Sequence, residues 1–144
     1  MAEPYDAGAV AVAVAVAARP SAEPVALVHP ADLGGARWVH RVSPSGRATT
    51  DVALPDGRRF SDADIAAVLV RSENTALPRF ARSPPADRDY ASAEFRALLV
   101  SWLHSLGSRV VNRVDGVGLA GPSWSPQRWL VEAGRAGVCV VASV

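Results

Sequence analysis

The segment DGVGLAGPSWSP contains Gly116-x-Gly118-x-x-Gly121, the glycine spacing of a dinucleotide-binding loop. In such a loop the backbone approaches a pyrophosphate, and the helix that follows directs its N-terminus at the phosphate. Here Pro122 follows the third glycine, and the next helix start signal comes only at Ser125, a favoured N-cap residue before a proline. The strand expected after that helix, VCVVASV, also lacks the acidic residue that binds a ribose. The glycines are therefore expected to form a flexible connection and to bind no nucleotide.

The chain contains no lysine, and all 15 of its basic residues are arginine. This excludes a Schiff-base mechanism, a Walker-type phosphate lysine and a serine–lysine dyad. Arginine cannot replace lysine as a base, because its guanidinium stays protonated in ordinary sites. We therefore expect no cofactor and no catalytic residue, and we expect the chain alone neither to bind nor to hydrolyse ATP.

Other catalytic and metal-binding patterns are weak. His29, His40 and His104 fall on two predicted strands and a helix, and no two of them have metal-ligand spacing. The segment GPSWS lacks the closing glycine of a nucleophile elbow. The single cysteine, Cys139, lies in a predicted apolar strand and is interpreted as a small buried hydrophobic residue.

Four polar residues lie where ligands bind in open α/β sheets, at strand ends and near a helix start. They are Arg71, Arg88, Glu94 and Asn112. They predict either a ligand site or a structural polar cluster, and the structural cluster is favoured. In that interpretation Arg71 and Glu94 form an ion pair that fixes the long helix on the sheet, and Asp87 or Asp89 caps that helix.

Composition sets broad limits on the type of protein. A chain of 144 residues with 49% apolar residues fits a single domain, predicted over 1–144. Its net charge of +1 and pI of about 8.0 do not favour nucleic acid or an anionic membrane as a partner. The longest apolar run, 8–18, is too short to span a bilayer and has no basic residue before it. It is predicted to be a strand, and a cytoplasmic location is expected.

The predicted fold is an α/β domain with a small, mostly parallel sheet flanked by helices and an antiparallel hairpin addition. Residues 1–7 are predicted to be disordered, and 72–87 to form a long proline-rich loop. A hairpin is predicted at Asp56-Gly57, and a capped single turn at SDADI. The predicted strands are 8–18, 25–29, 36–43, the two arms of the hairpin, 66–71, 109–112 and 138–142. The predicted helices are 89–106, ended by Gly107, and 126–136.

The order of these pieces resembles the N-terminal pre-ATP-grasp domain of ATP-grasp peptide ligases, especially those that modify ribosomal peptides. That domain typically has a hairpin ending in DGR, a strand ending in arginine, and an arginine and a glutamate at the head of a helix. A strand closing in Val-Asn and a helix ending in Ala-x-x-x-Gly follow. This chain has PDGRRF, AAVLVR, DRDYASAEFRALL, RVVN and SPQRWLVEAGRAGV, so the resemblance runs from about Val25 to Val144.

Two departures from that family affect the functional prediction. Ser125-Pro126 stands where the family has Asn-Lys, and CVVAS replaces its Pro-x-Thr. The ATP-grasp core, which supplies the family's nucleotide lysines and magnesium carboxylates, would begin where Val144 ends. The resemblance therefore implies a non-catalytic accessory subunit or scaffold for a separate ligase in peptide modification and natural product biosynthesis. The alternatives are a fragment or split half of a ligase, whose site another chain completes, and a small-molecule-binding α/β domain.

The aromatic residues indicate how such a subunit would associate. Trp124 and Trp129 flank the start of the C-terminal helix, and Trp102 lies on the long helix. Tryptophan is enriched at the centres of interfaces. We predict a homodimer or a stable complex with another protein, and a peptide is a candidate substrate of that complex. The alternative is that these tryptophans fold inward and complete the core.

Overall fold

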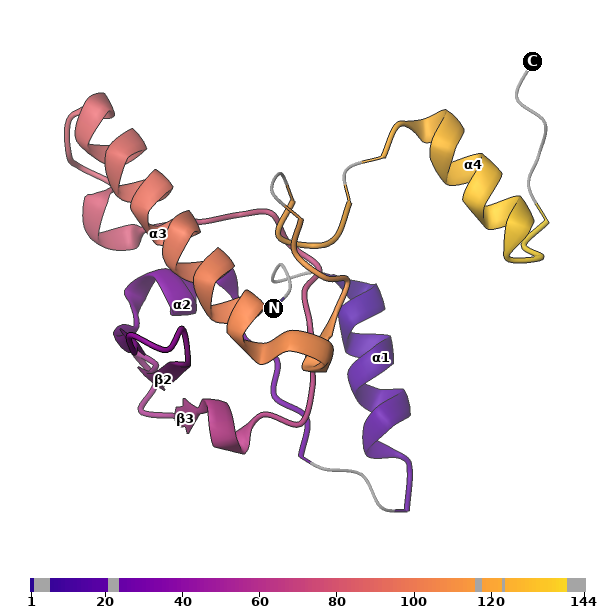
Figure 1. The fold of residues 1–144 in the computed structure, drawn as a ribbon, viewed down its shortest axis with the longest axis horizontal. Coiled ribbons are helices and arrows are strands. Elements are labelled where there is room, and N and C mark those ends of the chain that lie inside the picture. Colours follow the sequence, from indigo (N-terminus) through magenta and orange to yellow (C-terminus); the bar gives the residue numbers. More distant parts are fainter. Residues whose placement is uncertain (2–5, 21–23, 116–117, 123, 140–144) are drawn as a thin grey trace.

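The structure is a computed structural model that describes residues 1, 6–20, 24–115, 118–122 and 124–139. It contains four α-helices, α1 to α4, together with a three-stranded antiparallel sheet and a two-stranded parallel sheet in the described part of the chain (Figure 1). The α/β class is confirmed. The balance of the sheets differs from the prediction, because the larger sheet is antiparallel and only two strands are parallel.

The antiparallel sheet has the order β1-β2-β3, with β1 at Arg37–Val42, β2 at Ala48–Ala53 and β3 at Arg59–Ser61. The turn between β2 and β3 is the predicted hairpin at Asp56-Gly57. Gly57 N donates to Leu54 O at 3.1 Å, and Gly57 has φ +90°, a conformation that glycine adopts without strain. The sequence signal for this hairpin is local, and the structure confirms it.

The parallel sheet pairs β4 (Val68–Leu69) with β5 (Val110–Val111), and α3 (Pro85–Leu106) lies between them in the chain. The short helix η1 (Asp62–Asp64) precedes β4 and confirms the predicted capped turn, with a capping box between Ser61 and Asp64. The short helix η2 (Pro78–Phe80) lies in the predicted proline-rich loop, and η3 (Gly107–Arg109) precedes β5. Strands β4 and β5 therefore lie within the predicted strands 66–71 and 109–112, but both are shorter than predicted.

Helix α3 begins before the predicted start at Asp89. Pro84 is its N-cap residue and Pro85 its first residue, a position where proline costs no hydrogen bond. The prediction that Asp87 or Asp89 caps this helix is therefore wrong. The predicted end is confirmed, because Gly107 follows the last residue with φ +59°.

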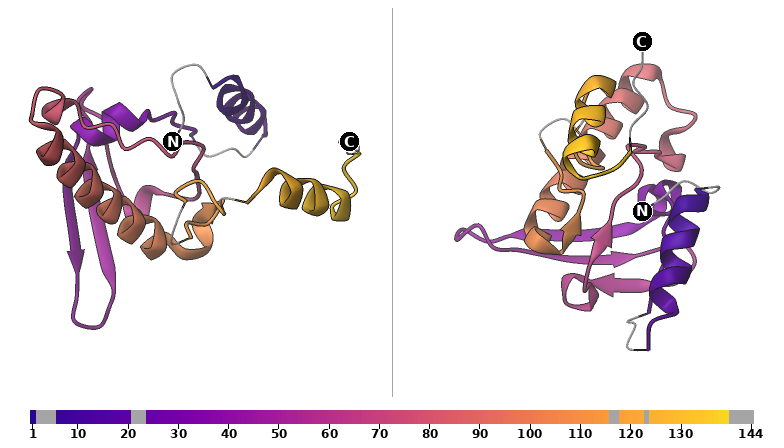
Figure 2. Two further views of the ribbon diagram at one scale, coloured as in Figure 1. Left: turned by 90° about the horizontal axis from the view of Figure 1, so that it is seen from above. Right: turned by 90° about the vertical axis from the view of Figure 1, so that its right-hand side faces the viewer.

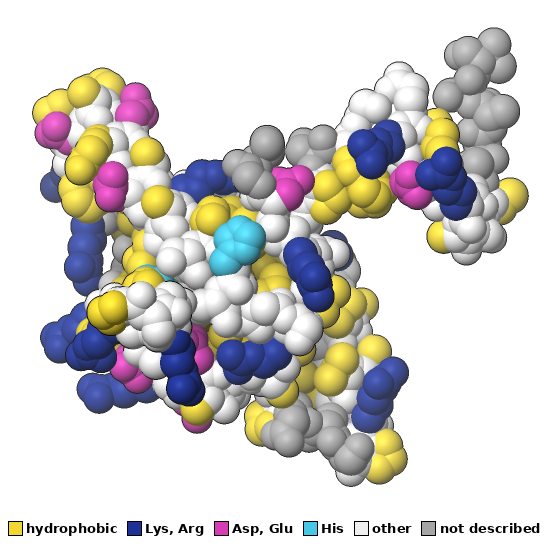
Figure 3. All heavy atoms as spheres, in the orientation of Figure 1, with side chains coloured by type: hydrophobic (Ala, Val, Ile, Leu, Met, Phe, Trp, Pro, Cys, Tyr) yellow, Lys and Arg dark blue, Asp and Glu magenta, His cyan; other side chains and the backbone are white. Residues whose placement is uncertain are grey.

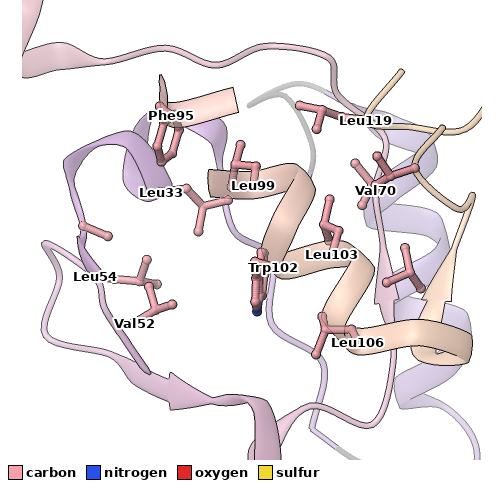
Figure 4. Packing of buried hydrophobic residues seen from close by; sticks show 13 residues of the cluster. Leu33, Val52, Leu54, Val70, Phe95, Leu99, Trp102, Leu103, Leu106 and Leu119 are labelled. Atoms are coloured by element: carbon pink, nitrogen blue, oxygen red, sulfur yellow. The ribbon is translucent and has the colours of Figure 1, made fainter. Parts of the chain in front are cut away.

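The hydrophobic core lies on both sides of α3. Figure 4 shows Leu33, Val52 and Leu54 on one side of this helix and Val70 and Leu119 on the other. Trp102 lies on α3 itself, and its indole Nε1 donates to Asp62 Oδ1 at 3.0 Å. The tryptophan ring also makes an edge contact with Trp38 of β1, with 5.2 Å between the ring centroids. Helix α3 thus joins the antiparallel sheet to the parallel pair.

The segment predicted as a strand over 8–18 is a helix instead, apart from its last residue. Helix α1 spans Ala7–Ala17, and Asp6 caps it by accepting a hydrogen bond from Ala9 N at 3.0 Å. The Val/Ala alternation indicated a strand because its period is two, but alanine has the highest helix propensity and the aspartate supplies a good N-cap. Residues 25–29, also predicted as a strand, are in no regular element and lead into the short helix α2 (Pro30–Gly35). The loss of these two strands explains why the parallel sheet is small.

The first residues were predicted to be disordered, but Met1 is held beside β4. Its ammonium donates to Leu69 O at 2.9 Å, and Arg71 N donates to Met1 O at the same distance. Asp6 is also placed, as the cap of α1. Residues 2–5 lie outside the described residues.

Helix α4 spans Pro126–Arg135, close to the predicted 126–136. Ser125 caps it as predicted, because its side chain accepts a hydrogen bond from Arg128 N at 3.3 Å. Figures 1 and 2 show α4 standing away from the rest of the described chain. Val138 and Cys139 are in no strand, and Cys139 is exposed rather than buried as predicted. The rest of the predicted final strand, 140–142, lies outside the described residues.

No helix in the described part of the chain is long and apolar enough to cross a membrane.

Candidate functional site

The glycine loop binds a carboxylate of its own chain. Leu119 N donates to Glu73 Oε2 at 2.8 Å, and Ala120 N donates to Glu73 Oε1 at 2.7 Å. Just before them, Gly118 N donates to Asp115 Oδ1 at 2.6 Å. Consecutive backbone N–H groups of this kind cradle phosphates in nucleotide-binding proteins. In this chain two of these amides donate to Glu73. The expectation that the loop binds no nucleotide stays a prediction.

Two glycines of this loop are required by its tight backbone conformation. A Cβ atom on Gly118 would lie 2.3 Å from Gly121 O, and Gly121 has φ +103°, so both positions need glycine. The first glycine of the motif, Gly116, lies outside the described residues. The glycine spacing that suggested a pyrophosphate is thus explained, at the two described positions, by a tight turn.

Glu73 has a central position in these contacts, and the sequence analysis did not predict it. Partial burial acts to raise the pKa of this carboxyl, but the amides of Leu119 and Ala120 and the guanidinium of Arg96 outweigh it, so that the pKa is lowered. Arg96 lies on α3, with its guanidinium nitrogen 3.2 Å from Glu73 Oε2. The carboxylate therefore ties the glycine loop to the long helix. No local pattern around Glu73 signals this role.

The four polar residues predicted to cluster have separate environments. Asn112, at the end of β5, donates from Nδ2 to Val70 O at 3.2 Å and has φ +61°. Arg88 and Glu94 are exposed on α3, and neither has an ion pair among the described residues. The predicted Arg71–Glu94 ion pair is wrong, because the guanidinium of Arg71 pairs with Asp6 instead.

The Arg71–Asp6 pair anchors α1 next to β4. Two guanidinium nitrogens of Arg71 donate to the two carboxylate oxygens of Asp6, at 2.7 and 2.9 Å. Asp6 also caps the helix, and a Cβ atom on Gly8 would lie 2.7 Å from the guanidinium, so the glycine leaves room for the pair. The hydrogen bond from Arg71, followed by that from Ala9 N, lowers the pKa of Asp6 to about 2.

This lowered pKa gives a testable pH dependence. Because the folded pKa of Asp6 is below its ordinary 3.8, the pair stabilises the fold fully at pH values above that ordinary pKa. The contribution is lost as the pH falls towards about 2. We expect the melting temperature of the wild type to exceed that of Asp6→Asn by a constant margin above about pH 5. The margin should shrink to zero as the pH falls through about 2, and a margin independent of pH would contradict the assignment.

The histidines have structural positions. His40 contacts Thr50 Oγ1 through Nδ1 and Ser101 Oγ through Nε2, each at 2.9 Å, and so links β1 to β2 and α3. His29 is the N-cap residue of α2, and His104 lies in the last turn of α3. Among the described residues, no three histidine, cysteine, aspartate or glutamate side chains are grouped to hold a metal ion.

The three tryptophans predicted to form an interface divide into two groups. Trp102 is 5% exposed and belongs to the core of the chain itself, so it is not available to a partner. Trp124 and Trp129 contact each other, with 4.8 Å between the ring centroids, and the Arg128 guanidinium lies 4.9 Å from the Trp124 ring centroid. Trp129 is 53% exposed. Of these three tryptophans, only the pair at α4 therefore remains as part of a candidate contact surface.

Helix α1 adds a second exposed apolar surface, which the strand prediction missed. Ala9 is its one buried residue among those described, and four valines are exposed: Val10, Val12, Val14 and Val16. Figure 3 shows hydrophobic side chains along α1 and on α4. A helix that is apolar on every side is usually covered by protein or lipid.

Comparisons with protein-family models, with curated proteins and with solved structures find no match.

Proposed function

We propose that this chain is a protein-interaction subunit that acts without a catalytic centre of its own, and that α4 is the helix that binds its partner. The observation that carries the proposal is the exposure of α4. None of its residues is buried, although Trp129, Leu130 and Val131 lie on it.

The residue pattern of α4 favours a helix that lies in a groove of a partner. Arg128, Glu132 and Arg135 recur at four and three residues and form one polar stripe, in which Arg135 donates to Glu132 at 2.9 Å. Trp129 and Leu130 fall outside this stripe, so the helix is amphipathic. Amphipathic helices can bind by laying their apolar face into a groove of a partner.

The length of α4 also supports a binding role. Helices shorter than about 12–15 residues are marginal in water and gain most of their stability from tertiary packing. Helix α4 has 10 residues, and its apolar residues do not enter the core of this chain. A partner would supply the missing packing, and the adjacent Trp124–Trp129 pair offers the aromatic anchor that dominates many interfaces.

The resemblance to pre-ATP-grasp domains suggests the identity of the partner. We propose a second copy of this chain or a separate ATP-grasp ligase that modifies peptides. The features that support this choice are the DGR hairpin between β2 and β3 and the parallel β4–β5 pair joined through α3, which follow the order of that family.

Sedimentation equilibrium tests the proposal. We expect the wild type to exceed the 15.0 kDa mass of one chain, either alone at micromolar concentration or when mixed with a cognate ATP-grasp peptide ligase. Trp129→Asp should weaken the association at least about tenfold, because it replaces an aromatic anchor by a charge at a position that the partner would bury.

Gln127→Asp is the matched control, since it puts the same charge on the same helix near its N-terminus, where a carboxylate is tolerated. It should associate like the wild type. A wild-type chain that stays a monomer, both alone and with the ligase, would exclude the proposed function.

A further inference from the structure

A small pocket lies between the segment 74–81 and the first turns of α3. Its volume is about 240 Å³, below the 300–1,000 Å³ typical of drug-sized ligand pockets. It therefore suits a small group rather than a nucleotide. Its lining includes Asn74, Thr75, Leu77, Phe80, Arg88 and Ser92.

The wall formed by 74–81 is fixed to its surroundings. A Cβ atom on Gly34 would lie only 1.9 Å from Ala76 O, so α2 and this segment are in close backbone contact. Arg79 donates to Gly35 O at 2.9 Å, and Asn74 N donates to Ser72 Oγ at 3.0 Å. This wall is consequently held in place before any ligand arrives, which lowers the ordering cost of binding.

Arg88 has an unusual position on α3. Residues 88, 92, 95 and 99 are spaced by four, three and four, so Arg88 and Ser92 extend the stripe on which Phe95 and Leu99 are buried. A charged residue on this stripe lines the pocket where the core ends. The Arg88 side chain has no ion pair or hydrogen bond among the described residues, although Asp87 and Asp89 are its neighbours in the chain.

We infer that this pocket binds a small carboxylate that carries an apolar substituent. The planar guanidinium of Arg88 matches a carboxylate and can pair with both of its oxygens. Ser92, Asn74 and Thr75 provide further polar groups, and Leu77 and Phe80 provide the apolar contact. Among the described residues, Arg88 is the only cationic one that lines the pocket, so a monoanion is favoured over a phosphate dianion. This site does not involve α4 and goes beyond the proposed function.

The test compares N-acetyl-L-leucine with its primary amide, using backbone amide NMR shifts of the full chain. We expect the acid to cause saturable shifts at Asn74, Thr75 and Ser92, with a dissociation constant on the order of 1 mM. The amide should bind at least about tenfold more weakly, because it lacks the charge that pairs with Arg88. Equal shifts from both compounds, or no saturable shift from the acid up to about 10 mM, would overturn the inference.

The variant Arg88→Gln should lose the acid's saturable shifts, with at least a tenfold weaker affinity. Arg82→Gln removes a nearby exposed arginine that does not line the pocket, and it should bind like the wild type. Equal weakening in both variants would show only general charge attraction and would overturn the assignment to Arg88.

A third compound, acetyl-Ala-Ala-Leu with a free carboxylate, distinguishes the source of the ligand. Tighter binding of this peptide than of N-acetyl-leucine identifies a peptide C-terminus as the ligand, and equal binding identifies a free small acid.

Discussion

Replacing Leu99 by alanine is expected to destabilise the fold by about 3–5 kcal/mol, measured by urea unfolding. Leu99 is 1% exposed and lies on α3 within the core cluster. The substitution removes buried methyl groups and leaves a cavity that the surrounding helix and sheet can only partly fill.

Leu130→Ala is the matched control for this prediction, since it makes the same chemical change on α4. Leu130 is 36% exposed and does not belong to the core. At concentrations where the chain is a monomer, this variant should change the unfolding free energy by less than about 0.5 kcal/mol. A large loss of stability for Leu130→Ala would show that α4 packs on its own core, against the structure.

Gly34→Ala is the second substitution with a large expected effect, about 3 kcal/mol of destabilisation. The new Cβ atom would lie 1.9 Å from Ala76 O and 3.4 Å from Leu77 Cα. Both of these atoms belong to the backbone, so no side-chain rotation can relieve the contact, and α2 must separate from the segment 74–77.

Gly35→Ala tests whether the effect comes from this contact. Both glycines belong to α2, so the change in helix propensity is similar at the two positions. At Gly35 the nearest atom is the side-chain carbon Pro55 Cγ, at 3.1 Å, which can move. We expect a cost below about 1 kcal/mol in thermal or urea unfolding. Similar losses for the two variants would contradict the close backbone approach at Gly34.

The elements predicted correctly from the sequence are those with local signals. Asp56-Gly57 specifies the hairpin turn, and Ser125-Pro126 specifies the start of α4, because each signal acts within a few residues. Helix α1 was predicted wrongly, since the alternation of valine and alanine has the period of a strand. The cap at Asp6 and the helix propensity of alanine decided the outcome instead.

The partners of the polar residues could not be predicted. Arg71 was expected to pair with Glu94, but its partner Asp6 is 65 residues away in the sequence. Glu73 binds the glycine loop across a separation of 46 residues. The sequence identifies which groups carry charge, but the pairing of distant groups depends on how the elements pack. The same limit applies to the pocket at Arg88, because its other wall comes from a separate segment.

Hydrogen exchange of the α4 backbone amides tests the central claim, that this helix binds a partner, most directly. In the associated wild type, either self-associated or mixed with the ligase, the amides within Pro126–Arg135 should exchange at least about tenfold more slowly than in Trp129→Asp. The amides of α3 serve as the internal reference, because this helix packs in the core in either state and should be protected equally in both proteins. Equal exchange of α4 in the two proteins, under conditions where the wild type is associated, would contradict the claim.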